Sequence, residues 1–232
     1  MHEIAEAIRS ELIKIGTDEG ITKTKHYFRE PIVTYGCTSS DVKKISAMFS
    51  PLLRKNLDLA FIIAGDLMNS GVMEENWVGT NLIAKHKKRI RSEHFEIFDK
   101  WIDNLNNWAS IDTFTTDIVV EAVKRNPQLV DRLIQWTQSP NRWRRRASAV
   151  TLVRIARSGG MLKEVLSVTD KLMEDPDDMV QKGAGWLLKE ASKKHPKEIH
   201  DYLVKWKPKT SGLILRYASE KLPQDLKVYK SR

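Results

Sequence analysis

The fold of this chain is decided by the stretch Ser139-Pro140-Asn141-Arg142-Trp143-Arg144-Arg145-Arg146-Ala147. A Ser-Pro turn and an Asn, a residue that commonly caps helices, precede apolar residues at three- and four-residue spacing. Residues 139–163 contain six arginines and no Asp or Glu. An acid-free helix of this kind is an anion-binding surface, and a solvated or salt-bridged helix is the alternative. Because nearby carboxylates are missing, the sequence favours contact with phosphate.

The same pattern recurs along the chain. Asp175-Pro176-Asp177 repeats Ser139-Pro140-Asn141 at an offset of 36, and Asn106-x-Trp108 precedes Asn141-x-Trp143 by 35 residues. Apolar residues keep a helical spacing in almost every segment, and strand-like alternation between hairpin turns is not found. Repeated helical hairpins with a capping residue before the second helix predict an all-α fold, an α-solenoid of HEAT-like repeats. Such stacks have a concave face, and a plain helical bundle is the alternative.

The composition is that of a globular protein with an excess of positive charge. The chain has 232 residues, a formal net charge of +9 and a pI near 9.5, which favours a polyanionic partner. Cys37 is the only cysteine, so an intramolecular disulfide and a thiolate zinc cluster are excluded. The first residues lack a signal-peptide pattern, and the longest apolar run, 57–65, is too short for a bilayer. We therefore expect a cytoplasmic protein without a membrane partner.

Trp108 and Asp112 are four residues apart and share one face of a predicted helix. A bound ligand could touch both side chains. Alternatively, the Trp is a packing anchor near a helix start, and the Asp stabilises the positive end of the helix. Read with the arginine segment one repeat downstream, the two residues indicate a cation-rich groove that contains a Trp and an Asp.

Three further motifs carry candidate residues. In the arginine segment, Arg146 lies at the border of the expected buried stripe, and Arg154 follows two turns later on a similar face. A second acid-free cluster, Lys85-His86-Lys87-Lys88-Arg89-Ile90-Arg91, is either another phosphate-contacting patch or a solvated face. In the helix 180–190, two glycines favour close helix packing, whereas Trp186 fits the core and the groove equally. Residues from Lys182 to Trp186 are expected near the groove.

The histidines have no metal-ligand spacing, and neither a P-loop nor a dinucleotide fingerprint occurs. The sequence therefore predicts neither a metal nor a nucleotide cofactor.

Several segments resemble one known family in matching order over nearly the whole chain. They are Tyr27-Phe28-Arg29-Glu30-Pro31, Asn107-Trp108-x-x-x-Asp112, Asn141-Arg142-Trp143-Arg144-Arg145-Arg146-Ala147, Gln181-Lys182-Gly183-x-Gly185-Trp186-Leu187-Leu188-Lys189-Glu190 and Leu215-Arg216-Tyr217-Ala218. Together they resemble the AlkD-type DNA glycosylases of the DNA alkylation repair family. The resemblance implies a single C-shaped domain over residues 1–232, which grips duplex DNA in a concave basic groove. It also implies removal of cationic N3- and N7-alkylated purines, such as 3-methyladenine and 7-methylguanine.

The resemblance also implies a role for individual residues. Trp108 and Trp186 would flank the lesion-bearing nucleotide, Asp112 would be the catalytic carboxylate, and Arg146 would hold the DNA backbone. Tyr27 would belong to the lesion-side wall, and Arg154 and Lys189 would contact DNA. Lys182, which the repeat register places near the groove, is expected to bind DNA as well. Lys189 stands where some relatives have Arg, which weakens a bidentate phosphate grip. Members of the family are expected to hold the damaged nucleotide without enclosing its base in a pocket.

The proposed chemistry suits these residues. An alkylated purine is already cationic and leaves without a general acid, while an anionic Asp112 would stabilise the oxocarbenium-like sugar and orient water. The aromatic faces of Trp108 and Trp186 would attract the same positive charge. No motif places a lysine as a Schiff-base nucleophile, so a monofunctional enzyme is expected. The ends of the expected solenoid carry no clear dimer signal, so a monomer is expected. The alternatives are a catalytically inactive solenoid that binds DNA structures and a scaffold for acidic proteins.

Overall fold

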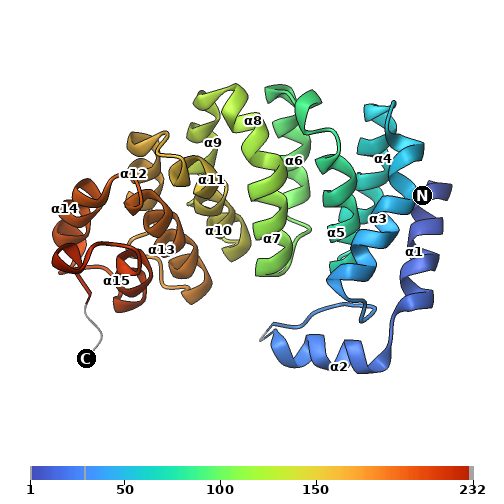
Figure 1. The fold of residues 1–232 in the computed structure, drawn as a ribbon, viewed down its shortest axis with the longest axis horizontal. Helices are drawn as coiled ribbons and strands as arrows, with labels where there is room; N and C mark the ends of the chain where they lie inside the picture. Colours follow the sequence, from blue (N-terminus) through green and yellow to red (C-terminus); the bar gives the residue numbers. More distant parts are fainter. Residues whose placement is uncertain (1, 29, 230–232) are drawn as a thin grey trace. The chain divides into compact units, whose positions relative to one another are not determined.

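The computed structural model describes residues 2–28 and 30–229, and this part of the chain is built of helices (Figure 1). It contains no strand, and only an isolated parallel bridge joins Val33 to Val72. The helices group into two compact units, Met1–Ala122 and Val123–Arg232. The prediction of an all-α fold of the α-solenoid class is confirmed. The prediction of a single domain stays a prediction.

The N-terminal unit consists of α1 (Glu3–Ile15), α2 (Asp18–Tyr27), α3 (Ser39–Leu53), α4 (Leu57–Met68), α5 (Met73–Ala84), the 3₁₀-helices η1 (Lys87–Arg89) and η2 (Ser92–His94), α6 (Phe95–Ile102), α7 (Trp108–Phe114), the π-helix η3 (Thr115–Val119) and the first residues of α8 (Val120–Arg125). Helix α1 packs on α3, α4 and α5, and α5 packs on α7. Thr38 and Asp41 form a capping box at the start of α3. The side chains of Phe95, Phe98 and Phe114 are fully buried in this unit.

The C-terminal unit contains the rest of α8, the 3₁₀-helix η4 (Pro127–Leu129), α9 (Val130–Trp136), α10 (Arg142–Val150), α11 (Val153–Arg157), α12 (Leu162–Asp170), α13 (Asp178–Ser192), α14 (Pro196–Trp206), α15 (Gly212–Ser219) and the 3₁₀-helix η5 (Gln224–Leu226). Helix α13 is central because it contacts α10, α11, α12, α14 and α15. Its apolar face, including Val180, Ala184, Leu187 and Leu188, is fully buried.

The helical repeat is regular along both units. Helices α5, α7, α10, α13 and α15 are the second helices of successive hairpins, and their first residues are 35, 34, 36 and 34 positions apart. Four of these helices begin with a side-chain cap, from Asn107, Asn141, Asp177 and Ser211, and each cap accepts a hydrogen bond from a backbone N–H in the first turn. Helix α5 follows Val72 and has no such cap. The prediction of a capping Asn or Asp before the second helix is thereby confirmed at Asn141 and Asp177. In the preceding repeat the cap is Asn107 and not Asn106, the residue aligned with Asn141, so this spacing is 34 rather than 35 residues.

Within the described ranges, no helix is both long enough and apolar enough to cross a membrane.

Candidate functional site

Aromatic side chains surround a hollow of about 400 Å³ in the N-terminal unit. Tyr27, the last residue of α2, is 69% exposed, and its ring centroid lies 6.0 Å from that of Trp108. The rings of Phe28 and Trp108 are 5.4 Å apart, and Met73 and Trp77 also line the hollow. Tyr27 and Trp108, which the resemblance assigns to the same lesion, are therefore in contact.

The floor of this aromatic hollow is a small apolar cluster. Phe28, Ile32 and Met73 are buried, and Trp77 and Trp108 pack against them while staying partly exposed. Trp108 is thus a packing anchor with an accessible part, so the two readings of its pattern are compatible. The indole Nε1 of Trp77 is buried and has no hydrogen-bond partner among the described residues, which is uncommon for a buried donor.

Glu74 fixes the loop that leads away from the aromatic hollow. Its fully buried carboxylate accepts hydrogen bonds from the backbone N–H groups of Tyr35, Gly36 and Cys37 at 3.0–3.1 Å, and from the hydroxyl of Thr34. Hydrogen bonds to a charged group each contribute about 1.5–3 kcal/mol. The loop after Phe28 is therefore held against the start of α5, beside Met73 in the hollow.

The neighbouring Glu75 ties three elements together. Arg9 of α1 donates to both carboxylate oxygens of Glu75, at 2.9 and 2.8 Å, and the hydroxyl of Tyr35 also donates to it. Burial, together with this hydrogen bond to Glu75, raises the pKa of Tyr35 above its usual range, so Tyr35 remains a neutral donor. Sequence reasoning missed both acids. The available signal was an adjacent acidic pair at the start of a helix that has no capping side chain.

Asp112 lies on α7 one turn after Trp108, and both side chains are partly buried. The helix is started by the buried Asn107, whose Oδ1 accepts the backbone N–H of Ser110 at 2.9 Å. Asp112 is the fifth residue of α7, beyond its first turn, so stabilisation of the positive helix end does not explain its position. The π-helix η3 follows α7 directly, and π-turns inside helices are frequent at functional sites.

At least three of the six arginines in the segment 139–163 pair with carboxylates, so the lack of acids within the segment does not leave these arginines available for phosphate. The pairs are Arg142 with Asp177 (2.9 Å) and Asp178 (3.3 Å), Arg145 with Asp175 (2.7 Å), and Arg157 with Glu190 (2.7 Å). A fourth arginine, Arg144, stacks on the ring of Trp136 at 5.4 Å. The acids come from the next repeat, so the salt-bridged alternative holds for these three arginines.

Arg146 is only 5% exposed, deeper than the border position that its spacing indicates. Its Nη1 donates to the carbonyl oxygen of Met179, at the start of α13. Gly183 permits this approach, because a Cβ there would lie 3.2 Å from the Cγ of Arg146. A Cβ on Gly185 would lie 2.6 Å from the Cβ of Tyr217. Close helix packing, the favoured role for these glycines, is confirmed on both sides of α13.

One face of α13 carries Lys182, Trp186 and Lys189, which are three and four residues apart. Lys182 pairs with Asp178 at 2.8 Å and Lys189 with Glu220 at 3.1 Å. Trp186 lies between these two lysines in the sequence, and its side chain is half-buried. It therefore belongs wholly to neither the core nor the surface.

The expected site residues thus form a group within each unit. Tyr27, Trp108 and Asp112 lie around or beside the aromatic hollow, and Arg146 packs on the helix that carries the Lys182 face. Arg154, on α11, is exposed. Their roles in binding and catalysis stay predictions. In the described part of the chain, no three or more His, Cys, Asp and Glu side chains gather as a possible metal site.

Comparison with known proteins adds a family match. A family model described as DNA alkylation repair enzyme matches residues 8–222. The fold is similar to a structure described as a predicted DNA alkylation repair enzyme from Enterococcus faecalis, with a TM-score of 0.78, 16% identity, and coverage of 90% of this chain and 97% of that one. It is also similar to smu.31 from Streptococcus mutans UA159, with a TM-score of 0.56, 17% identity, and coverage of 95% and 100%. At these identities the structures show the fold alone. No curated protein matches.

Proposed function

Because the chain belongs to the family of DNA alkylation repair enzymes, we propose that it is a monofunctional DNA glycosylase acting on alkylated duplex DNA. The reaction is hydrolysis of the N-glycosidic bond of purines that carry a positive charge from N3 or N7 alkylation, such as 3-methyladenine and 7-methylguanine. We further propose that the enzyme is a cytoplasmic monomer that needs neither a metal nor a nucleotide cofactor.

The observation that carries the proposal is the pairing of Trp108 and Asp112 on one turn of α7, beside the aromatic hollow. The scissile bond of a cationic purine breaks with positive charge developing on the sugar. A carboxylate in a partly desolvated position stabilises that charge more strongly than one in water. Asp112 would therefore stabilise the transition state and orient water, while the Trp108 ring attracts the cationic sugar and base.

The open wall of the hollow supports a reaction without base enclosure. Tyr27 is 69% exposed and yet contacts Trp108, so the wall that the two rings form is accessible from solvent. A damaged nucleotide would lie against this wall rather than inside a closed pocket. Selectivity would then come from the lability of the cationic base, and bulky adducts would be tolerated.

The C-terminal unit supplies cations for the DNA backbone in this proposal. The Lys182–Asp178 and Lys189–Glu220 pairs are partly exposed, and exposed pairs contribute only about 0–1 kcal/mol. A phosphate can therefore replace either acid at low cost. Arg146 is oriented by its bond to the carbonyl oxygen of Met179, and we assign to it the backbone contact that the family resemblance implies. Trp186 and the exposed Arg154 complete the proposed DNA-contacting set.

The test is release of 7-methylguanine from methylated duplex DNA under single-turnover conditions. We expect Asp112→Asn to slow release by about 100- to 1,000-fold, the usual effect of removing one preorganised electrostatic group. Asp58→Asn is the matched control, because it makes the same charge change at an exposed position of the same unit. Thermal unfolding of each variant establishes that the fold is retained.

Each outcome has a clear reading. If Asp112→Asn releases base as fast as the wild type and Asp58→Asn, the assigned mechanism is wrong. If the wild type binds DNA in a salt-dependent manner without releasing base, the chain is a DNA-binding module. If it ignores DNA and binds acidic peptides, it is a protein scaffold.

A further inference from the structure

A second hollow, also of about 400 Å³, lies in the N-terminal unit where α3 and α5 end. It is lined by Ala47, Ser50, Pro51, Arg54, Lys85 and His86, and is called the basic pocket below. Met73 begins α5 at the aromatic hollow, and Lys85 directly follows the last residue of α5. At 1.5 Å per residue, about 18 Å of helix separates the two hollows.

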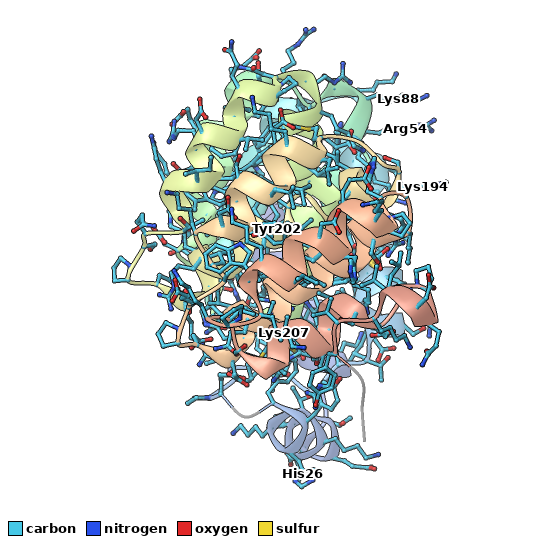
Figure 2. The ribbon with its side chains drawn as sticks, turned by 90° about the vertical axis from the view of Figure 1, so that its left-hand side faces the viewer. His26, Arg54, Lys88, Lys194, Tyr202 and Lys207 are labelled. Carbon is cyan, nitrogen blue, oxygen red and sulfur yellow. The ribbon has the colours of Figure 1, made fainter. Side chains whose placement is uncertain are left out.

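The charges at the basic pocket are not neutralised by carboxylates. Arg54 and Lys85 are exposed, and neither forms an ion pair with any residue in the described ranges. No acid occurs from Lys85 to Ser92, and the nearby Lys87 pairs with Asp117 at 3.1 Å. In Figure 2, Arg54 and Lys88 project from the same edge, whereas His26 of α2 lies at the opposite end of the unit.

A link between the two helix ends gives the basic pocket a fixed shape. The Nη1 of Arg89 lies 3.5 Å from the carbonyl oxygen of Lys55 and 3.4 Å from the Nδ1 of His86. His86 is only 4% exposed, and burial, aided by the charge of Arg89, lowers its pKa. His86 therefore forms a neutral wall at pH 7, and the charge comes from the lining residues Arg54 and Lys85 and from Arg89, which lies next to His86 outside the lining.

The helix dipole explains part of this arrangement but not its net charge. Arg54 and Lys85 are the C-cap residues of α3 and α5, where cations are favoured. Each helix C-terminus carries a partial charge of roughly −0.5, so the two ends together supply about −1. The three cations Arg54, Lys85 and Arg89 exceed this value, and the pocket remains positive.

We propose that the basic pocket binds a backbone phosphate of the same DNA duplex, outside the lesion site. The inference rests on the proposed function only in taking duplex DNA as the ligand. One helical turn of DNA is about 34 Å long, so 18 Å corresponds to roughly half a turn, and one duplex can supply phosphates to both hollows. The contact would add affinity that does not depend on the damaged base.

The test compares the salt dependence of binding to an undamaged duplex of about 20 base pairs, from roughly 50 to 200 mM KCl. We expect the double variant Arg54→Gln/Lys85→Gln to lower the slope of log K against log salt by about 0.9, the value for one phosphate contact. At 0.1 M salt this corresponds to about 8-fold weaker binding. Lys14→Gln/Lys43→Gln is the matched control, since both lysines are exposed on the same unit and the net charge changes equally.

The proposal is overturned if the two double variants lower the slope equally, or if Arg54→Gln/Lys85→Gln leaves it unchanged. An unchanged slope with lost binding of inorganic pyrophosphate would instead assign the pocket to a small anion. Release of 7-methylguanine at saturating enzyme should be the same in wild type and Arg54→Gln/Lys85→Gln. If the wild type releases no base but the slopes still differ as expected, the glycosylase proposal fails and the basic pocket stands.

Discussion

Gly185→Ala introduces a methyl group where α13 and α15 are closest. A Cβ at this position would lie 2.6 Å from the Cβ of Tyr217 and 3.3 Å from the carbonyl oxygen of Ile214, whereas ordinary contact begins at 3.4 Å. The two helices must therefore separate by roughly 0.8 Å, and such overpacking costs about 1–3 kcal/mol. Alanine returns about 1 kcal/mol through its higher helix propensity. Because a Cβ cannot retreat without its backbone, we take the overpacking cost in the upper part of this range, about 2–3 kcal/mol, and expect a net loss of about 1–2 kcal/mol.

The assay is thermal unfolding followed by circular dichroism. For a chain of this size, 1 kcal/mol shifts Tm by about 2–4 °C, so Gly185→Ala should melt roughly 2–8 °C below the wild type. Gly183→Ala on the same helix is the control. Its Cβ would lie 3.2 Å from the Cγ of Arg146, only about 0.2 Å inside ordinary contact, so the helix-propensity gain should offset the crowding and Tm should change little. The reasoning is refuted if Gly185→Ala melts at or above the wild-type temperature, or no lower than Gly183→Ala.

Two other predictions concern titratable groups. Burial opposes ionisation of Glu190, yet hydrogen bonds from Arg157 and Lys193 outweigh it and lower its pKa below 4.5. This stabilisation is present above about pH 4.5 and is lost as the pH falls through the folded-state pKa. Between about pH 5 and 3, the urea midpoint of the wild type should therefore fall by more than that of Glu190→Gln. Equal decreases in the two midpoints contradict this prediction. Burial, with the charge of Glu74, raises the pKa of Cys37 to about 11. Because only the thiolate reacts, iodoacetamide at pH 8 should modify the native thiol about 100-fold more slowly than the thiol of the urea-unfolded chain. Equal rates of modification contradict this prediction.

The features predicted correctly from the sequence are those whose physical causes lie within a few residues. Asn141 and Asp177 cap the helices that follow them because a cap bonds to backbone N–H groups two or three positions on. For the same reason, the shared face of Trp108 and Asp112 was readable, since it needs only one helical turn.

The aromatic hollow could be foreseen only in part. The contact between Tyr27 and Trp108 joins residues far apart in sequence, and only the family resemblance pointed to it. For the Glu74 clamp that fixes the intervening loop, the adjacent acidic pair at the start of α5 was an ambiguous signal. An acid in the first turn of a helix equally fits a role in stabilising the positive helix end. Only the docking of the backbone at 35–37 reveals that Glu74 is buried and serves as a hydrogen-bond acceptor.

The arginine segment shows why charge in a repeat protein has to be counted over a whole repeat. Arg142, Arg145 and Arg157 pair with acids that lie 30–36 residues downstream, so a window limited to residues 139–163 reports an acid-free helix. When charge is counted over a whole repeat for Lys85–Arg91, the count includes Asp117, which lies thirty residues after Lys87 and pairs with it. Lys85, by contrast, has no ion pair among the described residues. The cluster with fewer cations thus retains charge that its repeat does not neutralise. The slope of log K against log salt counts the counterions that leave DNA when protein cations neutralise its phosphates. Arg142 and Arg145 are already paired with acids, so the slope should respond more to Arg54 and Lys85 than to these two arginines.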